Sequence, residues 1–447
     1  MNIKFSSGSE SFIASNFWGE RKPRRQKIVV LVFFLPLFFS VFRYIPGFEW
    51  TLEVAILATL ICAISTWRWI SNSFNIYIIL VAFGIPIWGA LNAALVFGQP
   101  FWLGLVAQRA YLLSLFALTI IRLISTRRVT MIEVKQSFVA LAWINLAFCA
   151  PVVLFLDPNQ YNDVGALVSN GGGVYNQFNL PLMFILFGAF YYAGLWFRTN
   201  QAKYIAVALP FYLYIFGGNS GRILNISVVL MFITLAFIGS SRQRLLRNLT
   251  KTIGLIAGVT ILAAVLAPDK VNTMATKYAD AFSAITGENT VDDPSANARI
   301  LQTAIALPLI ESNLIAGTGS ISNQWNDGYK RLFGYFHPTD LGVLGITFVY
   351  GIIGLFFFWI QYIFAWRYSR KLASAINSHQ DVDFLLAILG CLGFLLVSSI
   401  TTGSFAFYPE QSLFFLATLY AGTTNRSTQM RSITRTKSAQ IGIQRHA

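Results

Sequence analysis

Long apolar stretches, separated by short polar or charged segments, recur along almost the whole chain. A helix that crosses the hydrocarbon core of a bilayer needs about 20 predominantly apolar residues, and the recurring stretches are of this order. The pattern therefore predicts an all-α polytopic membrane protein with about 12 transmembrane helices. The expected spans are residues 28–42, 51–66, 74–97, 101–121, 136–156, 178–196, 204–216, 223–239, 252–267, 338–364, 384–402 and 411–422.

One long segment between the ninth and tenth expected spans, residues 268–336, does not follow this pattern of closely spaced apolar stretches. Loops of such length are usually functional or disordered. Here Asp293 and Pro294 suit the start of a helix, and the residues that follow have a helical pattern up to a turn at Gly317-Thr318-Gly319. We expect part of the segment to be ordered and packed on the membrane surface.

The composition excludes a soluble domain, because 55% of the 447 residues are hydrophobic and only 11% are charged. The net charge of +15 does not indicate a nucleic-acid partner, since the basic residues are scattered in short clusters between apolar stretches. Cys62, Cys149 and Cys391 all lie inside apolar stretches and are expected to be packing residues rather than a disulfide or metal framework.

The distribution of Lys and Arg predicts the orientation. With the N-terminus inside, 25 of the 33 basic residues lie on the side of the termini and 7 on the opposite side, as expected when positively charged loops stay in the cytoplasm. The chain then consists of a cytoplasmic segment 1–27, a transmembrane domain 28–422 and a basic cytoplasmic tail 423–447. Residues 268–336 form a partly helical periplasmic loop.

Nucleotide-dependent chemistry on the cytoplasmic side is not indicated. The sequence has no Gly-rich phosphate-binding motif, and Asp381-Val382-Asp383 resembles an acidic metal site only superficially, because its loop is short. We expect that acidic triplet to be a solvated loop end. An activated substrate should reach the protein through the membrane or from outside, with no metal and no cofactor.

Two arginines depart from the charge pattern. Arg222 stands at the N-terminus of an apolar helix, where the helix dipole disfavours a cation, so a bound anion explains it better than a neutral surface position. Arg109 lies about 12 Å of helix rise inside an expected span, where a charge is costly. It faces either an anionic ligand or a structural partner, for which Glu53 is the available acid.

Arg299 and His337 are the candidates on the outer segment. Arg299 is either a ligand-binding or a solvated helix residue. His337, the one histidine outside the expected cytoplasmic segments, is either an interfacial residue or a general base. Pro338 suits a first helical turn, which places His337 near the N-cap. Asp340 would then orient the imidazole or merely cap the helix.

The order of these elements resembles the O-antigen ligase and polymerase superfamily of membrane glycosyltransferases, over residues 204–364. The matching elements are Gly218-Asn219-Ser220-Gly221-Arg222, Asn297-Ala298-Arg299, Gly317-Thr318-Gly319, His337 and Asp340-Leu341-Gly342. The resemblance implies a GT-C-like fold in which Arg222 and Arg299 bind the diphosphate of a lipid-linked donor and His337 activates the acceptor hydroxyl. Arg109 matches a further cation of the family more weakly.

The expected function is a metal-independent, inverting polymerase that joins polyprenyl-diphosphate-linked oligosaccharides into exopolysaccharide or O-antigen at the outer face of the bacterial inner membrane. A ligase that transfers glycan to the lipid A core is the close alternative. A transporter or flippase for the same lipid is disfavoured because intramembrane acids and related halves are not apparent. Expected partners are the donor, the saccharide acceptor, membrane lipids, and proteins that regulate chain length or export.

Overall fold

The computed structural model describes residues 50–65, 72–126, 128–155, 168–170, 173–175, 182–218, 222–238, 242–266, 268, 272, 275–276, 294–334, 336–373 and 379–423. The expected N-terminal segment 1–27, the first expected span 28–42 and the tail from residue 424 lie outside these residues.

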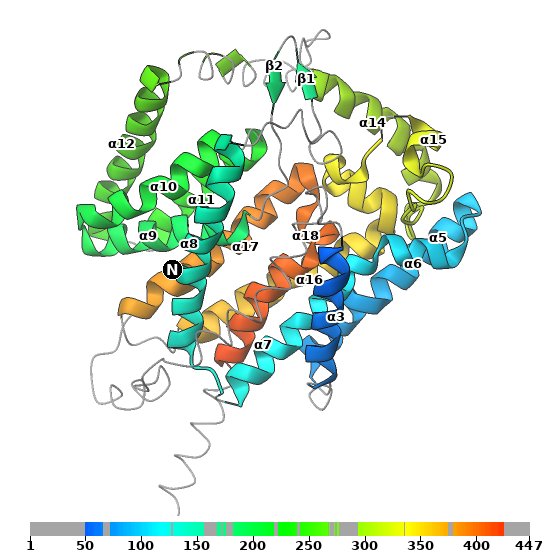
Figure 1. Cartoon of the computed structure of the whole chain (residues 1–447), viewed down its shortest axis with the longest axis horizontal. Coiled ribbons are helices and arrows are strands. Elements are labelled where there is room, and N and C mark those ends of the chain that lie inside the picture. Colours follow the sequence, from blue (N-terminus) through cyan, green and yellow to red (C-terminus); the bar gives the residue numbers. More distant parts are fainter. Residues whose placement is uncertain are drawn as a thin grey trace, which may run out of the picture.

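The described chain is almost entirely helical (Figure 1). Its first half comprises α3 (Thr51–Ile64), α4 (Ser73–Ile79), the π-helix η2 (Leu80–Gly84), α5 (Ile85–Phe97), α6 (Phe101–Ala107), the 3-10 helix η3 (Arg109–Leu115), α7 (Phe116–Ser125), α8 (Met131–Phe155), α9 (Met183–Thr199) and α10 (Ala202–Gly218). The second half comprises α11 (Arg222–Ile238), α12 (Arg242–Leu266), α14 (Pro294–Ser312), α15 (Tyr329–Phe333), the 3-10 helix η5 (Pro338–Leu341), α16 (Val343–Ala373), α17 (His379–Thr402), α18 (Ser404–Phe407) and a helix at residues 409–423.

Within the described residues, four helices are long and apolar enough to cross a membrane: Ser73–Phe97, Met131–Pro151, Val343–Leu372 and Val382–Thr402. A fifth candidate is the pair Phe101–Ala107 and Arg109–Ser125, which is bent by 54°. The expected membrane-protein class agrees with these helices. The number of about 12 spans stays a prediction, because several of the expected spans correspond to apolar helices of only 10–17 residues.

Local signals explain where several helices begin and end. Gly98, with φ of 73°, ends α5 in the left-handed conformation, which glycine adopts without steric cost, and α6 begins directly after Pro100. At the start of α8, the Glu133 carboxylate accepts a hydrogen bond from the Thr130 backbone N–H at 2.8 Å, and the Thr130 hydroxyl accepts one from the Glu133 N–H at 3.3 Å. This reciprocal capping box satisfies two N–H groups that the helix leaves unpaired.

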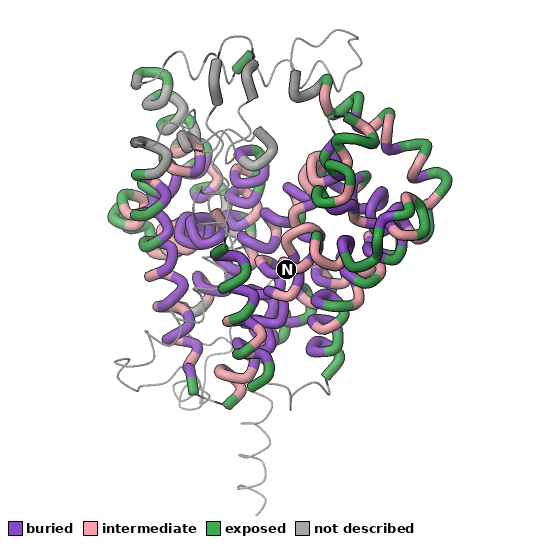
Figure 2. The backbone as a smooth tube through the Cα atoms, turned by 45° about the vertical axis from the view of Figure 1, so that its right-hand side comes forward, coloured by how far each residue is buried: buried purple, intermediate pink, exposed green. Residues whose placement is uncertain are grey.

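A cluster of aromatic side chains holds the centre of the bundle. Phe138 of α8 is fully buried, and its ring lies 5.1–5.8 Å, centroid to centroid, from five other phenylalanine rings. These rings come from α9, α17 and the helix at 409–423, namely Phe184, Phe187, Phe384, Phe414 and Phe415. Edge-to-face and offset packing of this kind stabilises the contact of four helices at one point, and Figure 2 shows the buried residues concentrated along the middle of the bundle.

A small antiparallel sheet was not among the predicted elements. Strands β1 (Val168–Asn170) and β2 (Gly173–Tyr175) pair with Val168 opposite Tyr175. Asn170 also pairs with Gly173, and the intervening sequence Gly171-Gly172 favours a tight two-residue hairpin. The hydrophobicity pattern did not reveal the strands because each has only three residues.

The described part of the long segment 268–336 is partly helical, with α14 beginning at Pro294 as predicted and α15 following a non-helical stretch at 313–328. Helix α14 packs against η5 and α16. In Figure 1, α14, the small sheet and one end of α12 lie at one end of the bundle, whereas the connection between α7 and α8 lies at the opposite end. The described end of the long segment and the α7–α8 connection, which were predicted to lie on opposite sides of the membrane, thus lie at different ends of the bundle.

Candidate functional site

The segment at residues 313–322 links α14 to α16 through backbone hydrogen bonds. The N–H of Thr318 donates to the carbonyl of Phe348 at 2.7 Å, and the N–H of Gly319 donates to that of Val349 at 2.9 Å. The predicted turn is confirmed, since Gly317 and Gly319 have φ of 75° and 90°. The end of α14 is therefore held against the first turns of α16.

A break in α16 makes these bonds possible. Gly351 has φ of 68° and ψ of −174°, so the helical ladder is interrupted there and carbonyls one turn earlier are free to accept from another segment. The N–H of Ile352 in turn donates to the Leu314 carbonyl at 2.9 Å. A Cβ at position 351 would clash with the carbonyl oxygen of Ile315, so the close approach requires glycine.

Helix α5 holds the same segment from the other side. The N–H of Ser320 donates to the carbonyl of Gly89 at 3.0 Å. The Ala316 carbonyl accepts from the Asn92 amide at 2.6 Å and from the Trp88 ring N–H at 3.0 Å. Because both sides are bonded, this part of the outer segment is a fixed element of the fold, on which a site can be positioned accurately.

His337 and Asp340 lie where the chain enters α16. His337 is the N-cap of η5 in an extended conformation, with Pro338 at the first helical position, as the sequence predicted. The N–H of Asp340 donates to the His337 carbonyl at 2.9 Å. The His337 side chain is exposed and that of Asp340 is partly buried, so the pair lies at the boundary between the protein interior and the outside.

Arg299 lies on α14, close in the fold to this pair. Burial raises the pKa of the Asp340 carboxyl, and the charges of His337 and Arg299 oppose the rise. Helix α14, which carries Arg299, packs against η5, which carries Asp340. The structure thus brings together three of the five residues singled out in the sequence, from two segments that are far apart in the chain.

Gln302 also belongs to this cluster, although the sequence analysis missed it. Its side chain is only 1% exposed, and its Oε1 accepts a hydrogen bond from the backbone N–H of His337 at 3.0 Å. Gln302 follows Arg299 by three residues, which puts the two side chains on neighbouring positions of one helix face. That spacing was the available signal, but a lone glutamine in an apolar helix carries little information by itself.

The structure places the backbone of Arg222 but not its side chain, which lies outside the described residues. Helix α11 begins at Arg222, as expected from the sequence. The proposed anion-binding role of this residue therefore rests on its position at a helix N-terminus and stays a prediction.

Arg109 pairs with the acid that the sequence offered as its structural partner. Its Nη2 lies 2.8 Å from the Glu53 carboxylate, and its Nη1 donates to the Val106 carbonyl at 3.0 Å. The side chains are 41% and 53% exposed, so the ion pair contributes little stability. The geometry supplies the structural partner, while a role of Arg109 in substrate binding stays a prediction.

The expectation of a solvated loop end at Asp381-Val382-Asp383 is wrong for Asp383. This residue lies inside α17 and is fully buried. Its two carboxylate oxygens share the Nε–H of Arg198 of α9, at 2.9 and 3.1 Å, and Oδ2 also accepts a hydrogen bond from Arg198 Nη2. A buried carboxylate is retained only when it is paired. Asp383 thus joins two helices and is not available to a metal or nucleotide.

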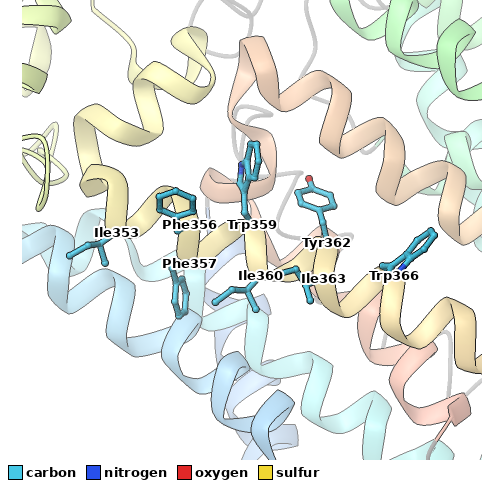
Figure 3. Close-up of a pocket in the computed structure, with 8 residues that line it drawn as sticks. All are labelled: Ile353, Phe356, Phe357, Trp359, Ile360, Tyr362, Ile363 and Trp366. Atoms are coloured by element: carbon cyan, nitrogen blue, oxygen red, sulfur yellow. The ribbon is translucent and has the colours of Figure 1, made fainter.

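An apolar groove of about 800 Å³ follows α16 beyond its break (Figure 3). It is lined by Ile353, Phe356, Phe357, Trp359, Ile360, Tyr362, Ile363 and Trp366. The aromatic side chains project from one membrane-spanning helix, and the groove begins two residues after Gly351.

A scan against protein-family models, a search of curated proteins and a search of solved structures each found no match to this chain. Among the described residues, no three His, Cys, Asp or Glu side chains are grouped so that they could hold a metal ion. The site must therefore be interpreted from its own geometry.

Proposed function

We propose that the protein is a polysaccharide polymerase of the inner membrane, which joins polyprenyl-diphosphate-linked repeat units on the outer side. The observation that carries the proposal is the convergence of Arg299, His337 and Asp340 where α14 meets the start of α16. The cluster combines a guanidinium, an imidazole and a carboxyl at the entry to a membrane-spanning helix. This is the location at which a lipid-anchored diphosphate would lie.

The reaction is a single displacement. His337 takes the proton of the acceptor hydroxyl as its oxygen attacks the anomeric carbon of the donor sugar, and the bond from that carbon to the diphosphate oxygen breaks with inversion. The polyprenyl diphosphate leaves with the electron pair of the broken bond. Arg299 and Arg222 stabilise its developing charge, because planar guanidinium groups donate two hydrogen bonds to phosphate oxygens.

Asp340 supports the histidine in this scheme. A carboxylate near an imidazole favours its protonated form, which arises when the acceptor hydroxyl loses its proton. The negative charge of Asp340 also attracts the guanidinium of Arg299 in the absence of substrate. The donor requires no nucleotide, no metal and no cofactor in this scheme.

The groove on α16 favours a lipid-linked molecule as the donor substrate. It lies on the same helix that begins beside His337, and its apolar and aromatic lining is suited to an isoprenoid chain that stays in the bilayer. A free sugar nucleotide has no long apolar chain that could bind to such a surface. The site and the groove together favour a substrate with a polar head and a long apolar tail.

The test is reconstitution of the purified protein in vesicles with a polyprenyl-diphosphate-linked oligosaccharide and no ion gradient. A ladder of glycans that differ by one repeat unit is expected from the parent and should be lost with His337→Ala. Transfer of the glycan to added lipid A core, without a ladder, would identify a ligase. Movement of intact donor across the bilayer with no new glycosidic bond would identify a flippase and overturn the proposal.

A further inference from the structure

We propose that Gln302 is a positioning residue that links the arginine-bearing helix α14 to His337, an inference that rests on the proposed function. Gln302 is buried, and its amide oxygen accepts the backbone N–H of His337 at 3.0 Å. Arg299 lies three residues before it on the same helix. One helix therefore carries both the cation for the leaving group and the acceptor that fixes the backbone of the general base.

The bond has a specific geometric effect. His337 stands before Pro338, so its backbone is extended and cannot continue into η5 as a helical residue. As the N-cap of η5, His337 also has an N–H that lies before the first hydrogen-bonded turn of that helix, and the Gln302 oxygen accepts it. On the C-terminal side of the same residue, the His337 carbonyl accepts the N–H of Asp340 at 2.9 Å.

The reaction depends on the position of the imidazole as well as on its presence. An error of about 1 Å in the placement of a reacting group can reduce a rate by about 100-fold. Gln302 connects Arg299 and His337 through one turn of helix and one hydrogen bond, so a shift of α14 would move both groups together. The distance between the diphosphate and the attacking hydroxyl is thereby set by a single rigid element.

The first experiment compares Gln302→Met, which keeps the volume and removes the acceptor, with Gln302→Glu, which keeps an acceptor oxygen in either protonation state. In vesicles, Gln302→Met should lower kcat about 10- to 100-fold with the KM for donor little changed. Gln302→Glu should recover most of that loss. The matched control is Gln324→Ala, because Gln324 is an exposed glutamine in the turn before α15.

A double-mutant cycle separates positioning from a merely structural role. If Gln302 acts through His337, then Gln302→Met should change the residual activity of a His337→Ala variant by less than about twofold. In an Arg299→Ala background, Gln302→Met should still cause the full loss of kcat. Two results would overturn the proposal. One is that Gln302→Met reduces activity equally in the parent and in the His337→Ala variant. The other is that Gln302→Met raises the KM for donor as Arg299→Ala does.

Amide hydrogen exchange tests the hydrogen bond between Gln302 and His337 without an activity assay. The His337 N–H should exchange faster in Gln302→Met than in the parent or in Gln302→Glu, and unchanged exchange would overturn the proposal. A parent that transfers no glycan would overturn the proposed function and the catalytic positioning with it. Faster exchange in Gln302→Met would still establish the link between α14 and His337, so the two failures are distinguishable.

Discussion

Burial raises the pKa of the Asp340 carboxyl, and the neighbouring charges of His337 and Arg299 only partly oppose this rise. A carboxyl with a raised pKa binds its proton more tightly in the folded state than in the unfolded state. The folded state therefore loses stability as pH rises through the pKa of the folded carboxyl. In the proposed reaction, the negative charge of Asp340 supports the protonated imidazole of His337.

This balance predicts that Asp340→Asn is both more stable and less active than the parent. The asparagine side chain is neutral, so it avoids the cost of burying a charge but cannot support a protonated imidazole. The thermal midpoint of the variant should exceed that of the parent at about pH 7, and the difference should vanish below about pH 4, where the aspartate is protonated. Glycan formation should fall, but less than the 10²- to 10⁴-fold expected for removal of a general base.

The measurement is thermal unfolding in detergent at a series of pH values, with polymer formation in parallel. A variant that is less stable than the parent at about pH 7 would contradict the argument, because it would show that attraction to the two cations outweighs the burial of the carboxylate.

The arginines provide a second prediction for single residues. Arg299→Lys and Arg222→Lys should be nearly as damaging as the corresponding alanine variants, since lysine keeps the charge but loses the planar pair of donors. Each loss should be on the order of 10²- to 10³-fold in rate. Arg331→Lys is the control, because Arg331 lies on the exposed face of α15 and donates to Asn326. Full activity of both lysine variants would rule out bidentate binding of the diphosphate.

Among the elements, the broken helix α16 determines how the site is assembled. Its first turns carry the chain from His337 into the membrane, its interruption accepts the segment at 313–322, and its remainder carries the apolar groove. An unbroken helix would satisfy its own carbonyls and leave no acceptors for Thr318 and Gly319. The break therefore has a structural function and is not a local irregularity.

Gly351→Ala should consequently destabilise the protein by about 2–4 kcal/mol, through the left-handed backbone and the clash with the Ile315 carbonyl. The matched control is Gly258→Ala in α12, where a Cβ would meet no other atom within 4 Å. That change should be neutral or stabilising by up to about 1 kcal/mol. Thermal unfolding of both variants in detergent measures the difference, and equal midpoints would show that the position tolerates a side chain.

For the whole molecule, the central prediction is its orientation in the membrane. The uneven distribution of Lys and Arg between the two sides predicts that the connection between α7 and α8 lies in the cytoplasm and that the turn before α15 lies outside. In a variant lacking Cys62, Cys149 and Cys391, an impermeant thiol reagent should label Gln324→Cys on intact cells and label Thr126→Cys only after permeabilisation. Both residues are exposed in the structure. The reverse labelling would place the His337 cluster in the cytoplasm and exclude the proposed reaction.

Several features of this protein follow from the sequence without a structure. Runs of apolar residues specify membrane helices because a bilayer requires that every backbone group be satisfied within the segment. Local chemistry marks where helices begin: Pro294 begins α14, Arg222 begins α11, and Pro338 places His337 at an N-cap. These signals act over a few residues, so each can be recognised in a single sequence.

Other features depend on contacts between distant segments, which no local pattern encodes. The burial of Asp383 required α9 to supply Arg198, and the pairing of Arg109 required α3 to supply Glu53. Gln302 acquires its role only because α14 packs on η5 and presents an oxygen to the His337 N–H. A glutamine or an aspartate has the same local preferences whether or not a partner approaches it, and the approach is decided by packing of the whole chain.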